Sequence, residues 1–351
     1  MKFMKKSFKN MEPYFSKNIT DGIILNANES PYNVPDKIID EYIKRIKKLN
    51  FNRYPDMAAT DLCNAIANKF NVSNYNVTVG VGSDELIESA FRATLEPNDI
   101  VLSFSPSFSM YKVFAELSLA KFIPIDFKNN KFDVDLMLKN IKEYNPKLVL
   151  VCSPNNPNGA FLEEEEIKRI ASSTNGLVLL DLAYIDFAKY DYTYLGMEFE
   201  NIIAFRTFSK AMSLPSIRVG YAISSKDNID MINAIKPPYS VTSQSLILAE
   251  IAIKNYDLYK ENIEKIKSER NRLINEFIKL GYEVLPSEAN FIYLNISNDL
   301  YKLLEENKIY IRKFKTGPSR ITVGKEEENN ALLEVVKSYE NCRNWKKYKR
   351  N

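Results

Sequence analysis

The stretch RTFSKAMSLPSIRVGY, residues 206–221, lies between two short apolar runs at residues 202–205 and 219–223. Similar runs rich in valine, isoleucine and leucine occur earlier in the chain, at residues 77–81, 100–104, 122–125, 148–152 and 177–181. Short apolar runs separated by helical patterns are typical of buried strands in a mostly parallel sheet that is covered on both faces. The sequence therefore predicts an α/β fold, with a large domain at residues 50–245.

A second, smaller domain is expected after this one. Residues 246–280 are charged and have helical periodicity as far as Gly281. Strand-like and helical patterns then alternate, with strands expected at 290–294, 309–312 and 320–323 and helices at 299–306 and from 326 onward. We predict a small α+β domain at residues 246–351, against which the N-terminal segment, residues 1–49, packs. A cleft between the two domains would hold a ligand.

Length and composition are those of an ordinary globular protein. The 351 residues exceed the roughly 250–300 residues at which a single core stops growing, which agrees with two domains. Apolar residues make up 45% of the chain and charged residues 26%. A net charge of +3 gives no reason to expect a nucleic-acid partner, and the basic ends of the chain are interpreted as solvated tails.

We expect neither a secretory signal nor a membrane span in this sequence. No apolar run approaches the roughly 18 residues of a membrane span, and the basic residues 1–10 are not followed by the apolar segment of a secretory signal. Cys63, Cys152 and Cys342 are widely spaced and odd in number, as expected for reduced thiols. We therefore expect a cytoplasmic protein.

The chain contains no histidine. This excludes Ser-His-Asp catalysis, histidine acid–base catalysis and zinc sites that need a histidine ligand. Any proton transfer has to use a lysine, tyrosine, carboxylate, cysteine, water molecule or cofactor.

Lys210 is the first candidate catalytic residue. It follows Ser209 and precedes Arg218 by eight residues, with Thr207 close before it. A lysine reacts with an aldehyde only as the neutral amine, and a neighbouring cation or a dry pocket favours that form. The hydroxyl groups and the planar guanidinium suit a phosphate dianion. The spacing indicates an anchor for pyridoxal phosphate, although this segment alone is equally compatible with a surface lysine and an unrelated arginine.

The segment GVGSDE, residues 80–85, lies where a predicted strand ends and a helix begins. Free amides at a helix N-terminus, together with flexible glycine backbone, can bind a phosphate group. The dinucleotide motif GxGxxG would need a third glycine where Glu85 stands, so we do not expect a nicotinamide cofactor. A purely structural turn remains the alternative.

Two further strand ends carry polar residues. The loop SPNNPNG, residues 153–159, follows one predicted strand, and Asp181 ends the next, with Tyr184 three residues later. Ligands bind at the carboxyl ends of strands in open α/β sheets. A buried carboxylate needs a cation, and a protonated pyridine nitrogen would be one. The acidic run at residues 163–166 is expected to open a helix.

In this order, the chemistry-bearing segments resemble those of the fold-type-I aminotransferases of class I and II, which use pyridoxal phosphate. The resemblance extends from about residue 25 to residue 329 and is most specific to the histidinol-phosphate aminotransferase family. The segments that carry it are LNANESPY (25–32), RYPD (53–56), GSDELI (82–87), PSFSMY (106–111), KPPYSV (236–241), ANF (289–291) and RITVG (320–324).

The resemblance implies a role for each residue that would face the cofactor ring. Lys210 would bind the cofactor covalently and then, displaced by the substrate amine, move the proton between substrate and cofactor carbons. Asp181 would keep the pyridine nitrogen protonated, so that the ring withdraws electrons. Asn156 and Tyr184 would donate hydrogen bonds to the phenolic oxygen, and Phe108 would stack on the ring.

The resemblance also implies a homodimer and two anion sites. The cofactor phosphate would be bound by Ser83, Asp84, Thr207, Ser209 and Arg218, and by Tyr54 from the second subunit. The anionic end of the substrate would be bound by Arg320 and Arg312, with Asn156 beside them.

The sequence departs from the family pattern at a few positions. Leu182 and Asn158 replace a usual acid and a usual threonine, but neither position has a chemical role. Residues 211–216 lack the glycine that commonly follows the lysine, and the segment 312–320 is short, which bears on substrate choice.

We therefore expect an aminotransferase of histidine biosynthesis that acts on histidinol phosphate and 2-oxoglutarate. The alternatives are an aromatic or broad-range amino acid aminotransferase, a threonine-phosphate decarboxylase, and a regulatory protein that binds the cofactor without turnover.

Overall fold

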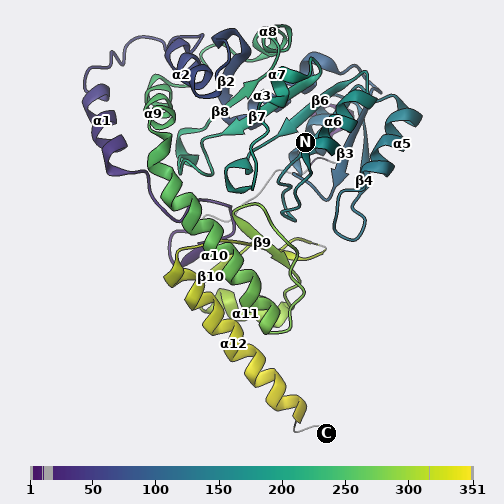
Figure 1. Cartoon of the computed structure of the whole chain (residues 1–351), viewed down its shortest axis with the longest axis vertical. Helices are drawn as coiled ribbons and strands as arrows, with labels where there is room; N and C mark the ends of the chain where they lie inside the picture. Colours follow the sequence, from purple (N-terminus) through teal and green to yellow (C-terminus); the bar gives the residue numbers. More distant parts are fainter. Residues whose placement is uncertain (1–2, 10, 12–18, 316, 349–351) are drawn as a thin grey trace.

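The computed structural model describes residues 3–9, 11, 19–315 and 317–348. The tips of the two basic ends, residues 1–2 and 349–351, lie outside the described residues. Figure 1 shows a large sheet wrapped by helices in the upper part of the molecule, and the C-terminal elements gathered below it.

The central sheet has seven strands, and each comes from one of the apolar runs predicted to be strands. The order is β2-β8-β7-β6-β5-β3-β4. β8 runs antiparallel to both of its neighbours, whereas the other neighbouring pairs are parallel. The mostly parallel α/β sheet predicted from the sequence is confirmed. The strands are β2 (Val77–Val81), β3 (Ile100–Ser105), β4 (Lys121–Asp126), β5 (Leu148–Cys152), β6 (Leu177–Asp181), β7 (Ile202–Thr207) and β8 (Val219–Ile223).

Helices bury both faces of this sheet. On β6, Leu179 packs on one side with α3 (Gly82–Thr94), α4 (Met110–Leu117) and α8 (Lys226–Ile235). Val178 and Leu180 pack on the other side with α5 (Val134–Tyr144), α6 (Glu164–Ser173) and α7 (Leu195–Glu198). Alternate side chains of a strand point to opposite faces, so a strand that is covered twice has to be apolar throughout.

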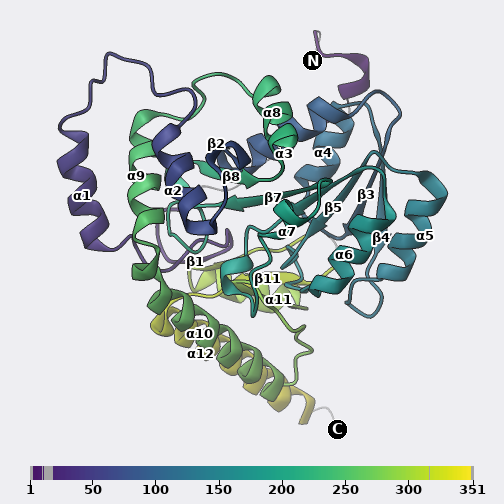
Figure 2. The same ribbon diagram turned by 45° about the horizontal axis from the view of Figure 1, so that its top comes forward.

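The C-terminal elements form two small sheets packed by long helices. β9 (Phe291–Leu294) pairs antiparallel with β11 (Ser319–Thr322), and β1 (Ile23–Leu25) pairs parallel with β10 (Ile309–Ile311). The strand β1 therefore lies with the C-terminal elements, although it comes from the N-terminal part of the chain. Figure 2 shows α10 and α12 side by side below the sheet. The helices of this part are α10 (Lys260–Lys279), α11 (Asn298–Glu306) and α12 (Glu326–Tyr348).

The helical stretch expected at residues 246–280 is two helices, not one. α9 (Ser243–Lys254) ends at Asn255, and the 3₁₀ turn η5 (Tyr256–Tyr259) separates it from α10. The two helices have different environments: α9 buries the continuous run 248–253 against α1 (Asp36–Ile46) and α2 (Thr60–Phe70), whereas α10 buries only one stripe against β9 and α12. The break lets each helix present its own apolar surface to a different neighbour.

Short elements complete the chain. The acidic run at residues 163–166 does open α6, where the Glu163 amide donates to the Glu166 carboxylate at 3.1 Å. Within the described ranges, no helix is both long and apolar enough to cross a membrane. The remaining 3₁₀ turns are η1 (Lys6–Phe8), η2 (Asn74–Asn76), η3 (Ile185–Phe187) and η4 (Pro215–Ile217).

Candidate active site

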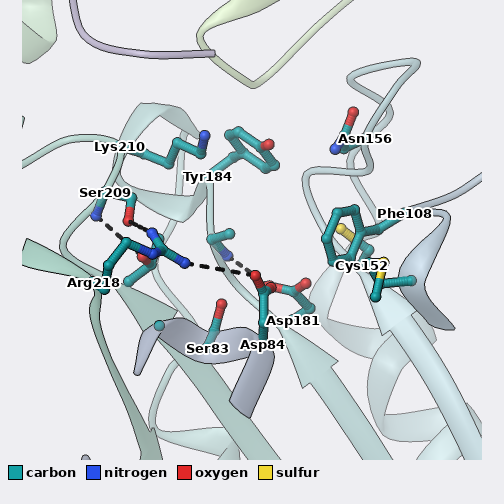
Figure 3. Close-up of a pocket in the computed structure, with 14 residues that line it drawn as sticks. Ser83, Asp84, Phe108, Cys152, Asn156, Asp181, Tyr184, Ser209, Lys210 and Arg218 are labelled. Atoms are coloured by element: carbon teal, nitrogen blue, oxygen red, sulfur yellow. Dashed lines mark hydrogen bonds and ion pairs between the residues drawn. The ribbon is translucent and has the colours of Figure 1, made fainter. Parts of the chain in front are cut away.

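A cavity of about 420 Å³ opens at the carboxyl ends of β5, β6 and β7, beside the N-terminus of α3 (Figure 3). Its volume and its position at the strand ends are those of small-molecule sites in α/β proteins. It brings together all the predicted cofactor-binding residues except Tyr54. The lining residues are Gly82, Ser83, Asp84, Phe108, Met110, Cys152, Asn156, Asp181, Ala183, Tyr184, Thr207, Ser209, Lys210 and Arg218.

One end of the cavity is built to bind an anion. The first residues of α3, including Ser83 and Asp84, have amides without helical partners, which point out of the helix N-terminus. Arg218 lies across from them, with its guanidinium 3.4 Å from the Ser209 hydroxyl and 3.7 Å from the Asp84 carboxylate (Figure 3). The Ser209 amide donates to the Thr207 hydroxyl at 3.1 Å. Positive charge, hydroxyl groups and free amides thus converge on one spot.

Glycines allow the backbone to close tightly around this end. A Cβ on Gly220 of β8 would lie 2.2 Å from the Ser83 nitrogen, so a side chain there would push β8 away from α3. Gly82 has φ +74, and a Cβ on it would lie 2.8 Å from the Arg218 guanidinium. The two glycines therefore set the distance between the helix N-terminus and the arginine.

Lys210 extends into the cavity from the turn after β7 (Figure 3). Its amine donates to the Ala27 carbonyl at 3.2 Å and lies 5.7 Å from the centre of the Tyr184 ring. Burial, assisted by the positive charge of Arg320, lowers the pKa of the Lys210 amine from 10.5 to about 8. A lysine with this pKa has an appreciable fraction of neutral, nucleophilic amine near neutral pH.

Asp181 ends β6 inside the cavity and is 6% exposed. Its carboxylate accepts hydrogen bonds from the Tyr111 hydroxyl at 2.5 Å and the Ala183 amide at 3.0 Å. No ion pair between described side chains includes it, and burial raises the pKa of Asp181 from 3.8 to about 6. Keeping this carboxylate ionised at neutral pH therefore costs about 3 kcal/mol, which a bound cation would offset.

Tyr184 and Asn156 lie on the side of the cavity away from Arg218, and Figure 3 shows the Tyr184 hydroxyl directed toward Asn156. The Asn156 side-chain oxygen accepts a hydrogen bond from Arg320, whose other terminal nitrogen donates to the Asn26 carbonyl at 2.8 Å. The Phe108 ring meets the edge of Tyr111 at a centroid distance of 5.5 Å. Tyr184, Asn156 and Phe108 thus line the cavity together with Asp181 and Lys210.

Three predicted site residues do not line the cavity: Arg312, Arg320 and Tyr54. Arg312 lies directly opposite Arg320 in an antiparallel bridge, with backbone hydrogen bonds of 3.0 and 2.8 Å in the two directions. Tyr54 is 82% exposed and its ring stacks on that of Tyr239, with 4.8 Å between the ring centroids, on the surface of the chain.

The N-terminal strap, residues 26–28, was not expected in the site. Its three successive carbonyls accept hydrogen bonds from Arg320, Lys210 and Asn290 respectively. These residues belong to the segment LNANESPY, which gave the family resemblance but no role. Tyr111 was missed in the same way, and its position three residues after Phe108 at the start of a helix was the only local signal.

The residues of the cavity fit pyridoxal phosphate. An anion site, a lysine with a lowered pKa and a buried carboxylate in need of a cation match the cofactor's phosphate, aldehyde and protonated ring nitrogen. The part of the chain that the structure describes contains no cluster of histidine, cysteine, aspartate or glutamate suited to a metal ion.

Comparison with known proteins decides the family. The family model for aminotransferase class I and II matches residues 20–336. The chain belongs to this family. A histidinol-phosphate aminotransferase from Thermoanaerobacter sp. (strain X514) is 37% identical over 345 residues, which cover 95% of this chain and 96% of that protein. The resemblance, the fold type and the enzyme class predicted from the sequence, a pyridoxal-phosphate-dependent aminotransferase, are thereby confirmed.

Solved structures of aminotransferases share the fold. The histidinol-phosphate aminotransferase of Sinorhizobium meliloti in complex with pyridoxal-5'-phosphate superposes with a TM-score of 0.87 at 21% identity, over 97% of this chain and 99% of that one. An aspartate aminotransferase from Thermotoga maritima gives a TM-score of 0.80 at 23% identity, over 92% of each chain. The fold is therefore common to aminotransferases with different substrates.

Proposed function

We propose that this aminotransferase interconverts histidinol phosphate and imidazole-acetol phosphate, with glutamate and 2-oxoglutarate as the second pair, in histidine biosynthesis. The relatives at 32–37% identity that cover 95% of the chain carry the name of this activity. The structural observation that carries the proposal is the pairing of Arg312 with Arg320. Side chains of directly opposed residues in an antiparallel pair extend from the same face, so two guanidinium groups can meet one phosphate dianion.

Pyridoxal phosphate supplies an electron-withdrawing ring that stabilises negative charge on the substrate carbon. Asp181 would hold the ring nitrogen protonated, with Tyr111 fixing its carboxylate. Asn156 and Tyr184 would bind the phenolic oxygen, and Phe108 would stack on the ring face.

Lys210 would attach the cofactor and, when released, move the proton at the substrate carbon. Its pKa of about 8 gives it a neutral form that can accept a proton near neutral pH, as general acid–base catalysis requires. The chain has no histidine to do this instead. The phosphate would be bound by Ser83, the Asp84 amide, Thr207, Ser209 and Arg218.

The enzyme would act as a homodimer in which Tyr54 reaches the cofactor phosphate of the second subunit. Support comes from apolar exposure on the surface around Tyr54: Phe51 is 67%, Tyr54 82%, Met57 58% and Tyr239 47% exposed. Side chains of this size exposed together are typical of a protein–protein interface. The unpaired Cys63, Cys152 and Cys342 agree with the cytoplasm as its location.

We also propose the domain division expected from the sequence, with a large domain at residues 50–245 and a small domain at 246–351, against which the N-terminal segment 1–49 packs. The pairing of β1 with β10 supports the last point. The contact of α9 with α2 favours extending the large domain beyond residue 245 to the end of α9, close to η5.

Substitution of the two arginines tests the substrate. Changing Arg312 to alanine should impair the reaction with histidinol phosphate far more than that with glutamate, by roughly the 1.5–3 kcal/mol of a charge-assisted hydrogen bond, which is about 10- to 150-fold in kcat/KM. Changing Arg320 to alanine should impair both reactions, because the glutamate α-carboxylate would bind there. The proposal is wrong if the Arg312 variant treats histidinol phosphate as the wild type does.

A general amino acid aminotransferase is the second candidate. Arg320, held by Asn156 and the Asn26 carbonyl, could bind the α-carboxylate of an aromatic amino acid without help from Arg312. Such an enzyme would be insensitive to the Arg312 substitution.

A further inference from the structure

Asn28 joins the N-terminal strap to the candidate active site. It is 1% exposed, and its backbone is in the left-handed region with φ +55. Its side-chain nitrogen donates to the Tyr184 hydroxyl at 2.9 Å. The left-handed backbone is one that asparagine, aspartate and glycine tolerate better than other residues.

The Thr322 hydroxyl fixes the orientation of the Asn28 amide. It accepts a hydrogen bond from the Asn28 backbone nitrogen at 3.0 Å and lies 3.3 Å from the Asn28 side-chain oxygen, to which it donates its single hydrogen. The reversed amide would direct a second donor at Thr322 and leave that hydrogen unused. The NH₂ group of Asn28 therefore faces Tyr184.

This orientation determines which way the Tyr184 hydrogen points. The Tyr184 oxygen already receives a hydrogen from Asn28, so its own hydrogen has to be donated elsewhere. Among the described residues, no group accepts it, and the Tyr184 side chain lines the cavity. The hydroxyl is thus oriented as a donor into the cavity.

We propose that Asn28 is a positioning residue: its hydrogen bond to Tyr184 orients the hydroxyl so that Tyr184 donates to the phenolic oxygen of pyridoxal phosphate. The inference rests on the function proposed above for Tyr184. Because neighbouring hydrogen bonds polarise one another, a donor behind the Tyr184 oxygen also strengthens the bond that Tyr184 makes.

The same residue connects the cofactor end with the substrate end of the site. Thr322 is two residues from Arg320 on β11, and the Asn28 carbonyl accepts from Asn290 at 3.1 Å. The strap therefore carries both the donor to Tyr184 and the carbonyl that binds Arg320 within three residues.

The visible absorption of the bound cofactor tests the proposal without measuring turnover. The visible absorption of the bound cofactor changes with pH, and the midpoint of this change is the quantity to measure. A hydrogen bond donated to the phenolic oxygen withdraws charge from it, which lowers that midpoint. Asn28→Asp keeps the shape and the left-handed backbone but replaces the donor with an acceptor, so the Tyr184 hydrogen would turn away from the cavity. We expect the midpoint to move upward by about one pH unit, in the same direction as in Tyr184→Phe.

Two further variants show whether Asn28 acts through Tyr184. Asn28→Gly, which suits φ +55 without adding charge, should shift the midpoint upward by less than Tyr184→Phe does. The double variant Asn28→Gly/Tyr184→Phe should match Tyr184→Phe alone, because no hydroxyl remains to be oriented. Ser30→Ala is the matched control: its hydroxyl hydrogen-bonds to the backbone of Tyr32, a few residues after the strap, and the variant should titrate as the wild type does.

The outcomes separate the inference from the proposed function. If Tyr184→Phe leaves the midpoint unchanged, the role of Tyr184 is wrong and the inference is wrong with it. If Tyr184→Phe shifts the midpoint but Asn28→Asp behaves like Ser30→Ala, only the inference about Asn28 is overturned. The inference would also be overturned if Asn28→Gly shifted the midpoint equally in the wild type and in the Tyr184→Phe background.

Discussion

At the scale of single residues, Lys210 shows how the site controls a pKa. The largest cause of its lowered pKa is burial, which disfavours the charged amine, and the second is the guanidinium of Arg320. Asp84 and Glu29 act in the opposite direction. The balance leaves a pKa of about 8, so the amine is mostly protonated below pH 8 and mostly neutral above it.

We predict that acylation of Lys210 in the cofactor-free protein rises with pH around a midpoint near 8, whereas ordinary lysines respond near 10.5. Arg320→Gln removes a positive charge and should raise the Lys210 midpoint, but not fully to 10.5, because burial remains. Competitive labelling followed by mass spectrometry of the Lys210 peptide measures this.

Arg312→Gln is the control for that experiment, because the main causes of the lowered Lys210 pKa are burial and the charges of Arg320, Glu29, Asp84 and Arg218. It should leave the midpoint unchanged. A Lys210 midpoint near 10.5 in the wild type would show that the amine is not desolvated.

At the scale of elements, a buried ion network fixes β7, the strand that leads to Lys210. Arg206 of β7 is 1% exposed and donates to Asp186 and Asp191, each at 2.6 Å. Asp186 follows Tyr184 on η3 and also accepts from the Tyr256 hydroxyl of η5 at 2.5 Å. The network thus joins the lysine strand, the tyrosine loop and the break between α9 and α10.

Arg206→Met should lower the free energy of unfolding of the cofactor-free protein by about 3–5 kcal/mol, since it leaves buried Asp186 without its cation. Arg169→Met is the matched control: it removes an exposed pair with Asp135 and should change stability by less than about 1 kcal/mol. Urea denaturation of both variants measures the difference. Equal stability of the two variants would mean that the network does not hold β7.

The strands and the polar residues at their ends could be predicted because both are local features. The run at residues 177–181 is a strand that ends in Asp181. The glycine-containing segment at residues 80–85 leads from β2 into α3. Both agree with what the sequence indicated. The same applies to the lysine turn between β7 and β8. Each of these needs only hydrophobic pattern and turn chemistry over a few residues.

Features that depend on distant parts of the chain could not be predicted. The strap contacts Tyr184, Lys210 and Arg320 across 156, 183 and 294 residues of sequence. The break at η5 exists because α9 and α10 face different neighbours, which periodicity alone does not show. Nothing near Arg206 in the sequence indicates that it will be buried and paired with a carboxylate from η3.

At the scale of the whole molecule, the proposed role of Tyr54 requires a second subunit. Tyr54 is on the surface in one chain, stacked on Tyr239, and does not line the cavity of that chain. A role for Tyr54 at the cofactor phosphate therefore depends on association of two chains through this surface.

Tyr54→Phe should weaken retention of pyridoxal phosphate by roughly 0.5–1.5 kcal/mol, about 2- to 13-fold in Kd, because one hydrogen bond is lost. Equilibrium dialysis of the cofactor measures it. Tyr75→Phe, at another exposed tyrosine, should have no effect. A protein that sediments as a monomer and is fully active at the same concentration would contradict a shared site.

The half-reaction shows directly which substrate the enzyme uses. The purified holoenzyme is mixed separately with histidinol phosphate, glutamate, phenylalanine and threonine phosphate, and the loss of the cofactor's visible absorption band is followed. We expect histidinol phosphate to convert the cofactor with the highest kcat/KM, and glutamate to convert it as well. Faster conversion by phenylalanine, or release of carbon dioxide from threonine phosphate, would show that the proposed substrate is wrong.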